Sequence, residues 1–288
     1  MLLKEKSNEK YVILSASRMT DMPKYYPDEI IAETEKRIAK GAKIHTLVLW
    51  TKHPKALFDE KLLGFLNHMK KQKVQLSVLL TISGMGQKVY GKRKDEKPLI
   101  FEPNAPRFEE SINTLPQIIA LVGKPDRVKV RIDPIIRVRN HENKLISNLE
   151  LFPVILQQAV QKGVRQFVFS FLEKGVHKKV DRRMAKNGCE ILPPTPEERE
   201  KTKIWLKKLE KKYMVKISAC SVLGFEESRC IDGYFLEKIH NLKLPADKSE
   251  KRNRTQCACT KSIDIGGWPP KKCYTACEYC YSNAHYND

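Results

Sequence analysis

The sequence predicts an α/β fold, built as a TIM-type (β/α) barrel or partial barrel. Two observations support this class. Short apolar runs rich in Val, Ile, Leu and Phe, typical of buried parallel strands, alternate with longer amphipathic runs of helical period. Six apolar runs alternate with five helical runs within 288 residues without a low-complexity linker, so we expect residues 1–288 to form a single barrel domain.

The expected elements alternate in order along the chain. Strands are expected over residues 11–16, 44–50, 74–82, 128–132, 166–171 and 215–219, and helices over 27–40, 56–71, 106–122, 148–162 and 195–213. Thr195 suits the N-cap of the last helix, because Pro196 and two glutamates follow it. Gly41 and Gly163 stand where helix C-caps are expected.

Polar residues follow the expected strands, and in such a barrel the active site lies at the carboxyl ends of the strands. Any single strand can end in a polar residue, so the argument depends on the whole ring. The residues selected as catalytic candidates are Arg18, Asp21, Lys52, Arg131 and Asp133. Those selected for cofactor binding at the same ends are Ser17, Thr20 and Thr51.

Three cysteines near the C-terminus, Cys273, Cys277 and Cys280, have the spacing C-x3-C-x2-C. Three thiolates in one loop can bind three irons of a 4Fe–4S cluster and leave the fourth iron open. S-adenosylmethionine chelates such an iron, and its reductive cleavage starts radical chemistry by hydrogen abstraction. Tyr279 matches the aromatic residue of the radical SAM pattern and is a cofactor-binding candidate. The alternatives are a zinc knuckle, a redox-active set of thiols or a cluster closed by His285.

Four more cysteines, Cys220, Cys230, Cys257 and Cys259, precede this loop, and four thiolates would fully ligate a second cluster. We therefore interpret residues 220–288 as a cysteine-rich, cluster-binding segment. Alternatively, Cys220 and Cys230 are small buried residues, since free cysteine is often buried. Cys189 is assigned no role.

The charge balance is strongly basic, with 54 Lys and Arg against 34 Asp and Glu, a net charge of +20. Much of this charge lies in segments 88–94, 177–183 and 248–254, which we expect to surround the mouth of the barrel and to attract RNA or DNA. Solvation of surface lysines is the alternative explanation. The polar N-terminus and the lack of a long apolar run predict a cytoplasmic protein that does not span a membrane.

Several motifs resemble one family. They are segments 13–23, 49–54 and 131–134, and the cysteine-containing stretch 257–283. Together they resemble the family of the domain of unknown function 1848, whose members look like radical SAM proteins with the cysteine motif at the C-terminal end. Met19 stands where the family usually has a second arginine, and Ala276 where it often has glycine.

The resemblance implies a circularly permuted barrel. In ordinary radical SAM barrels the cysteine loop follows the first strand, whereas here a short strand over 262–265 and its loop come last. If that strand lies beside residues 11–16, the usual first strand is supplied by the end of the chain. Asp264, in the matching segment, is a further cofactor-binding candidate.

These observations predict a radical SAM enzyme that takes electrons from a donor protein and modifies an anionic substrate, with nucleic acid favoured. One rival is a non-catalytic nucleic-acid-binding protein whose iron–sulfur or zinc site is structural. The other is a radical enzyme that acts on a small anionic metabolite or a peptide.

Overall fold

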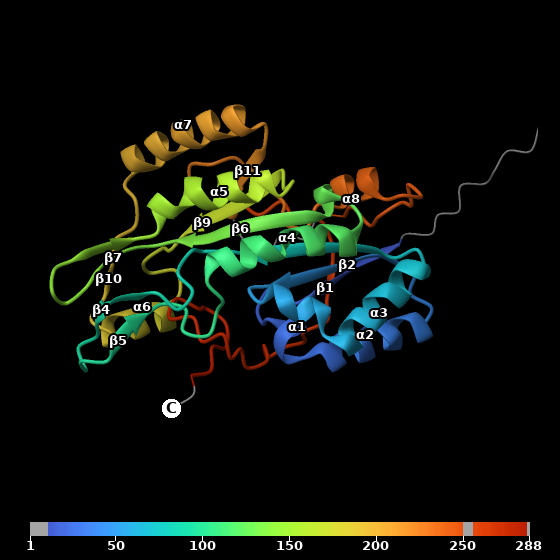
Figure 1. Ribbon diagram of the computed structural model, residues 1–288, viewed down its shortest axis with the longest axis horizontal. Coiled ribbons are helices and arrows are strands. Elements are labelled where there is room, and N and C mark those ends of the chain that lie inside the picture. The colour runs from blue at the N-terminus through green and yellow to red at the C-terminus, as the bar shows by residue number, and fades with distance from the viewer. Residues whose placement is uncertain (1–10, 250–255, 287–288) are drawn as a thin grey trace, which may run out of the picture.

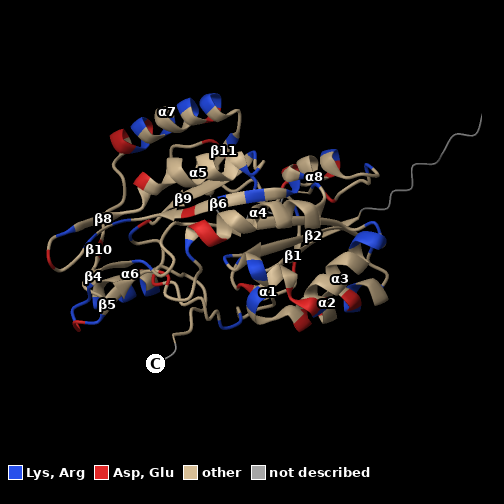
Figure 2. Cartoon of the chain, in the orientation of Figure 1, with Lys and Arg blue, Asp and Glu red and all other residues tan. Residues whose placement is uncertain are grey.

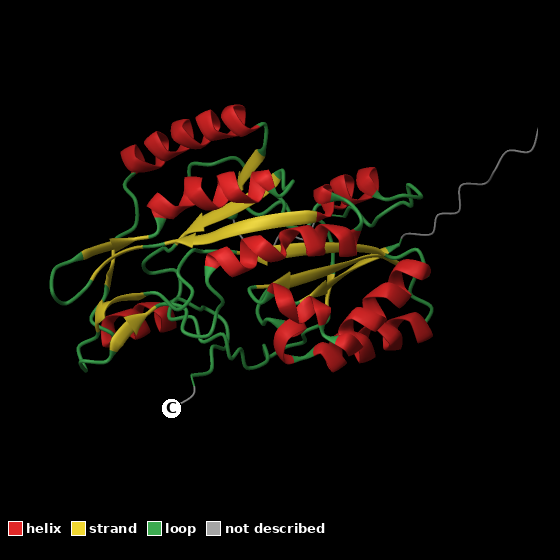
Figure 3. Cartoon of the chain, viewed as in Figure 1, coloured by secondary structure: helices red, strands yellow, loops and turns green. Residues whose placement is uncertain are grey.

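A computed structural model describes residues 11–249 and 256–286. Seven parallel strands form one sheet in the order β11-β9-β6-β3-β2-β1-β12, with helices packed around it (Figures 1 and 3). The strands are β1 (Val12–Ala16), β2 (Ile44–Thr51), β3 (Gln75–Thr81), β6 (Val128–Ile135), β9 (Gln166–Phe171), β11 (Lys216–Ala219) and β12 (Ile263–Asp264). The expected α/β class and all six expected strands are thus confirmed.

The sheet does not close into a barrel within the described residues. Its two edges are β11 and β12, which have four and two residues, and each pairs with only one neighbour. β12 pairs in parallel with β1, Leu14 opposite Ile263 and Ser15 opposite Asp264. The expected pairing of residues 262–265 with the first strand is therefore confirmed, whereas a closed barrel is not formed.

The main helices lie between successive strands of the sheet. They are α1 (Met22–Tyr25), α2 (Pro27–Ala39), α3 (Glu60–Lys71), α4 (Phe108–Val122), α5 (Phe152–Gln161) and α7 (Pro196–Tyr213). The helix expected over 56–71 begins later, because Pro54–Phe58 forms the 3-10 helix η1 and Asp59 caps α3. Similarly, the 3-10 helix η3 (Leu149–Leu151) precedes α5. Thr195 caps α7 as expected, and it also forms a capping box with Glu198.

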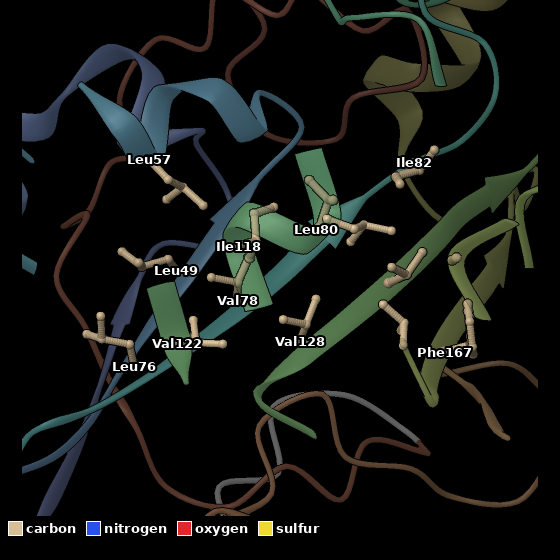
Figure 4. Packing of buried hydrophobic residues seen from close by; sticks show 14 of the residues in the cluster. Leu49, Leu57, Leu76, Val78, Leu80, Ile82, Ile118, Val122, Val128 and Phe167 are labelled. Atoms are coloured by element: carbon tan, nitrogen blue, oxygen red, sulfur yellow. The ribbon is translucent and has the colours of Figure 1, made fainter. Parts of the chain in front are cut away.

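One face of the sheet packs against these helices in the largest hydrophobic core. Leu49, Val78 and Leu80 point from the strands toward Ile118 and Val122 of α4 (Figure 4). Because side chains alternate along a strand, the neighbouring residues point to the other face.

That other face is covered by the cysteine-rich segment. Ile13, Val48 and Trp50 of the strands form a separate core with residues that follow β11, including Cys230, Cys259 and Leu236 of α8 (Gly233–Ile239). This packing explains why the sheet stays open, since the segment after β11 occupies the face that a closed barrel would turn inward.

Short elements inserted after β3, β6 and β9 were not expected from the sequence. They are the hairpin β4 (Val89–Lys92) and β5 (Pro98–Ile100), the three-stranded sheet of β7 (Arg137–Arg139), β8 (Leu145–Ser147) and β10 (Glu190–Ile191), and the helix α6 (Lys178–Lys186). The 3-10 helix η2 (Pro125–Arg127) precedes β6. The insertions build a small core that also contains Cys189, Cys277 and Tyr279. The three-cysteine loop is therefore anchored on them.

Positive charge is spread more widely than expected. Figure 2 shows Lys and Arg along α7 as well as near β4, β5 and α6. Lys92 pairs with Glu96, and Lys248 pairs with Glu237. Of the expected basic segment 248–254, residues 250–254 lie outside the described part of the chain. None of the described helices is both long and apolar enough to cross a bilayer.

Candidate functional site

A cavity of about 740 Å³ lies at the carboxyl ends of the strands. It collects residues that lie far apart in the sequence, as expected for the end of a parallel sheet. The residues selected from the sequence that line it are Ser17, Arg18, Thr20, Asp21, Thr51, Lys52, Arg131, Asp133, Cys220, Cys230, Cys257, Cys259, Cys273, Cys277, Tyr279 and Cys280. The roles assigned to them remain predictions, but their gathering in one cavity is a property of the fold.

The three-cysteine loop is held by hydrogen bonds to its backbone. Nη1 of Arg183 donates to the carbonyl oxygens of Glu278 and Cys280, each at 3.0 Å. The hydroxyl of Tyr286 donates to the carbonyl of Cys277 at 3.0 Å, and the Arg183 guanidinium lies over the Tyr286 ring. These contacts satisfy carbonyls that would otherwise be left unpaired as the loop turns toward the cavity.

Ala276, within this loop, has φ of +57°, in the left-handed region that favours glycine. This is the position where the resembled family often has glycine. The Ala276 side chain is buried, so the strained backbone is kept by the packing around it.

The sulfurs of the loop lie close enough to influence one another. The pKa of Cys277 is raised by burial above all, and Glu102, Cys280 and Cys273 add to this, while Lys52 opposes it. Binding of a metal centre would replace the protons on these thiols. The donor set, soft thiolates from one loop at a cavity wall, fits an iron–sulfur cluster.

A buried polar cluster adjoins Cys277. Nζ of Lys52 lies 2.8 Å from Oε1 of Glu102 and 3.1 Å from the hydroxyl of Tyr279. Tyr279 and Ser83 both donate to Glu102. Burial disfavours the Lys52 cation, but the nearby acids outweigh it, Glu102 first, so that its pKa is raised. Lys52 therefore keeps its positive charge beside the cysteine loop.

Glu102 was not predicted from the sequence. Only 2% of its surface is exposed. It follows the inserted hairpin of β4 and β5, which no strand-end argument selects. In the sequence, Glu102 is a single acid directly after the apolar run Leu99–Phe101. Nothing in this pattern indicates that its partner is Lys52.

Asp21 has a supporting role in the structure. Its carboxylate accepts from Thr51 Oγ1 at 2.8 Å and from the backbone nitrogen of Lys52 at 2.6 Å, and it caps α1 through Lys24 N. Both oxygens are thus occupied within the protein. Thr20, beside it, donates to the carbonyl of Lys271 and so attaches β1 to the segment before the cysteine loop.

Two arginine side chains lie against the ring of Trp50 in the cavity wall. The guanidinium carbons of Arg131 and Arg18 lie 5.2 Å and 5.7 Å from the Trp50 ring centroid. Arg131 is also paired with Asp133, Nη2 to Oδ2 at 2.6 Å, and Asp133 accepts from Ser170. Arg131 and Asp133 therefore satisfy each other, while Arg18 presents a partly exposed guanidinium.

Asp264 is not brought to the cavity wall. Its Oδ1 accepts from the backbone nitrogen of Gly266 at 2.9 Å, which shapes the turn after β12. A Cβ at Gly266 would lie 2.5 Å from Cβ of Ser17, so β12 can approach β1 this closely only with glycine there. Asp264 thus supports the turn that brings the chain toward the cysteine loop.

Three of the four additional cysteines form a row. Sγ of Cys230 lies 3.3 Å from Sγ of Cys220, and its backbone nitrogen lies 3.3 Å from Sγ of Cys259. Hydrogen bonds from the Cys220 and Cys259 thiols, together with the nearby cations Arg131 and Lys129, lower the pKa of Cys230 well below its ordinary value. The sequence placed these cysteines in one segment, and the fold brings them together.

Among residues 11–249 and 256–286, no three His, Cys, Asp or Glu side chains are grouped as ligands of one metal ion. A 4Fe–4S cluster makes a different demand, because each thiolate binds a separate iron. His285, considered as a fourth ligand, packs its ring against Tyr274 at a centroid distance of 5.0 Å.

Comparison with known proteins gives one family match. A model of the family described as Domain of unknown function (DUF1848) matches residues 13–282. No curated protein matches the chain. A solved carboxyl transferase domain of Rhizobium etli pyruvate carboxylase, with pyruvate and biocytin, has 9% identity and a TM-score of 0.34 over 74% of this chain and 27% of that chain.

A second structure of that carboxyl transferase domain has 10% identity and a TM-score of 0.33, over 74% of this chain and 26% of the other. This chain therefore spans about a quarter of the length of both proteins. Likeness at this level carries no argument about fold or function.

Proposed function

The chain belongs to the family described as Domain of unknown function (DUF1848), and from its site we propose that it is a radical enzyme that binds a 4Fe–4S cluster and S-adenosylmethionine. One observation carries the proposal. Cys273, Cys277 and Cys280 lie in one loop at the wall of the cavity that also collects the polar strand ends.

When bound, the cluster would supply the electron for reductive cleavage of S-adenosylmethionine, which starts radical chemistry on a substrate. Cys273, Cys277 and Cys280 would hold it. The electron comes from a separate donor protein. The protein's own residues have the tasks of holding the loop, placing the cosubstrate and shielding the cavity from water.

Lys52 and Arg183 support the cysteine loop in two different ways. Lys52 places a buried positive charge beside Cys277, which favours the thiolate over the thiol. Arg183 holds the backbone carbonyls of the loop and so fixes its course. Loss of either residue should weaken cluster binding more than it disturbs the main sheet.

Arg18 is our candidate for holding the carboxylate of S-adenosylmethionine. Arg131 is already paired with Asp133, and the oxygens of Asp21 are occupied. Arg18 lies over Trp50 at the cavity wall and is partly exposed. A guanidinium can bind a carboxylate through two parallel hydrogen bonds.

The proposal extends to the topology of the sheet. β12 lies beside β1 and leads into the cysteine loop, as expected if the first strand and its loop have moved to the end of the chain. We therefore describe the sheet as a circularly permuted partial barrel of the radical SAM type.

The substrate in this proposal is anionic, with RNA or DNA favoured over a small metabolite or peptide. Its support is the net charge of +20 and the arginines at the cavity wall. Binding to a short single-stranded RNA and DNA should weaken steeply as salt rises. Lack of affinity for both at low salt would leave the small-substrate alternative.

The test of the central proposal is anaerobic reconstitution with iron and sulfide, followed by reduction with dithionite. We expect the EPR spectrum of the reduced cluster to change on addition of S-adenosylmethionine, and 5′-deoxyadenosine to accumulate. The variant Cys277→Ala should lose both signals, while the matched variant Cys189→Ala, in the same small core, should keep both. An EPR spectrum unchanged by S-adenosylmethionine in the loaded protein would instead favour a structural cluster.

A further inference from the structure

A second group of cysteines lies at the same cavity, apart from the three-cysteine loop. Cys220 follows β11, Cys230 precedes α8, and Cys257 and Cys259 lie beyond α8. Two backbone contacts join these segments. Ser228 forms an isolated parallel bridge with Cys257, and the Ala258 nitrogen donates to the Ser228 carbonyl at 3.1 Å. Packing of the segment onto the sheet thus places four thiols from three stretches of chain together.

Two cations, the buried Arg131 and the partly buried Lys129, lie against this group. Nη1 of Arg131 lies 3.0 Å from Sγ of Cys230. Nζ of Lys129 donates to the carbonyls of Arg229 and Cys230 at 2.9 Å and 3.2 Å. A buried charge is costly unless an opposite charge compensates it. Asp133 already compensates Arg131. The thiolates of a metal centre would add negative charge beside Lys129, whose ammonium group donates to two neutral carbonyls.

The arrangement suits a cluster better than a single ion. Cys220, Cys230 and Cys259 form a row with Cys230 in the middle, and all four thiol residues line the cavity of about 740 Å³. A structural zinc site is instead closed on four sides by its ligands in a tetrahedron. Space on one side of the row leaves room for a group larger than an ion.

We propose that Cys220, Cys230, Cys257 and Cys259 bind a second iron–sulfur cluster, with Arg131 and Lys129 beside it. Four protein ligands leave this cluster no open iron, so it does not bind S-adenosylmethionine. The proposal goes beyond the function argued above and does not require it. The second site would exist even if the three-cysteine loop held no cluster.

The test counts iron and acid-labile sulfide after anaerobic reconstitution of the full chain. With four irons in each cluster, the wild-type protein should bind about eight irons per chain. The double variant Cys230→Ala with Cys259→Ala should bind about four, and so should Cys277→Ala with Cys280→Ala. The variant Cys189→Ala, a buried cysteine outside both groups, should match the wild type.

EPR then distinguishes the two clusters. The cluster left in the Cys277→Ala, Cys280→Ala variant should give a spectrum that S-adenosylmethionine does not change. In the Cys230→Ala, Cys259→Ala variant the remaining spectrum should respond. A response in neither variant, with both iron counts as expected, would remove the proposed function but support the second cluster.

Two results would overturn the inference. One is that the Cys277→Ala, Cys280→Ala variant (the loop variant) binds no iron. The other is that the wild-type protein binds about four irons per chain, all of which are lost in the loop variant. Uptake of one zinc in place of iron by the four-cysteine group would overturn it as well. If the Cys230→Ala, Cys259→Ala variant fails to fold, as judged by circular dichroism, the loop variant still decides. About four irons per chain in the Cys277→Ala, Cys280→Ala variant would support a second cluster, and the absence of iron from that variant would reject it.

Discussion

Nη1 of Arg183, on the inserted helix α6, lies 3.0 Å from the carbonyl oxygen of Cys280, the last cysteine of the loop. A residue from an insertion after β9 thus holds a loop that follows β12 at the far end of the sheet order. The small core of the insertions contains Cys277 as well. The insertions and the cysteine loop therefore form one structural unit.

The substitution Arg183→Ala should destabilise this unit. Hydrogen bonds from a charged donor contribute about 1.5–3 kcal/mol each, so we expect the free energy of unfolding in urea to fall by about 2 kcal/mol. Iron retention after reconstitution should fall with it, and Arg183→Lys should recover part of both. The neighbouring exposed residue provides the control, since Arg182→Ala should change neither quantity. Equal effects of Arg182→Ala and Arg183→Ala would contradict the role assigned to Arg183.

Ala276→Gly should stabilise the protein. The left-handed backbone at this position costs an alanine about 1–2 kcal/mol, while glycine loses about 0.5–1 kcal/mol more chain entropy on folding. We therefore expect a gain of about 0.5–1 kcal/mol in the free energy of unfolding, measured in urea without metal. The matched change Ala185→Gly, within α6, should act in the opposite direction by about 1 kcal/mol. Destabilisation by Ala276→Gly would show that the loop is not strained.

The stability of the protein should depend on His45, a fully buried residue of β2. Burial, and next the adjacent His240, lower its pKa to about 4. The folded state therefore binds the His45 proton less tightly than the unfolded chain, whose His pKa is about 6.5. This contribution to stability is complete above about pH 6.5 and is lost as the pH falls toward the folded pKa.

At pH 5, relative to pH 7, His45 should account for a loss of about 2 kcal/mol in the free energy of unfolding. The variant His45→Gln should show a correspondingly smaller difference between the two pH values, whatever its stability at pH 7. His68→Gln, an exposed residue of α3, is the control and should leave the difference unchanged. An unaltered pH difference in His45→Gln would assign the acid sensitivity to other groups.

Arg18→Ala should weaken S-adenosylmethionine binding in the reconstituted protein. Loss of a charged hydrogen-bond donor costs about 1.5–3 kcal/mol, which raises the Kd by about 10- to 100-fold. Anaerobic titration calorimetry measures this, with iron content checked to be the same in both proteins. Arg107→Ala, at the start of α4, serves as the control. An unchanged Kd in Arg18→Ala would show that Arg18 does not hold the carboxylate of S-adenosylmethionine, and would leave Arg131 as the candidate.

Six strands of the main sheet could be predicted because a buried parallel strand is a continuous apolar run, as in Gln166–Phe171. The strands of the insertions could not. Val89–Lys92 has four residues, with an exposed valine and lysine at its ends, and its pairing depends on a hairpin that the pattern does not show. The start of α3 was misplaced because Pro54–Phe58 continues the helical spacing but forms a 3-10 turn.

The site was predicted in part for the same reason. Arg18, Lys52 and Asp133 follow expected strands, so a rule about strand ends selects them. Glu102 follows no such strand, and its pairing with Lys52 depends on tertiary packing alone. Asp264 was selected by its motif, but its side chain accepts a hydrogen bond from the Gly266 nitrogen in its own turn. A motif does not show which partner a side chain takes.

The pairing of β12 with β1 has a consequence for the order of biosynthesis. β1 is synthesised long before β12, its neighbour on one side, and before the cysteine loop. The sheet edge beside Leu14 stays unpaired throughout that time, and long-range parallel pairing is slow to form. A nascent chain stalled before Ile263 would therefore expose an open strand edge at β1 to chaperones. The proposed cluster at the loop could assemble only after Cys280 had been synthesised.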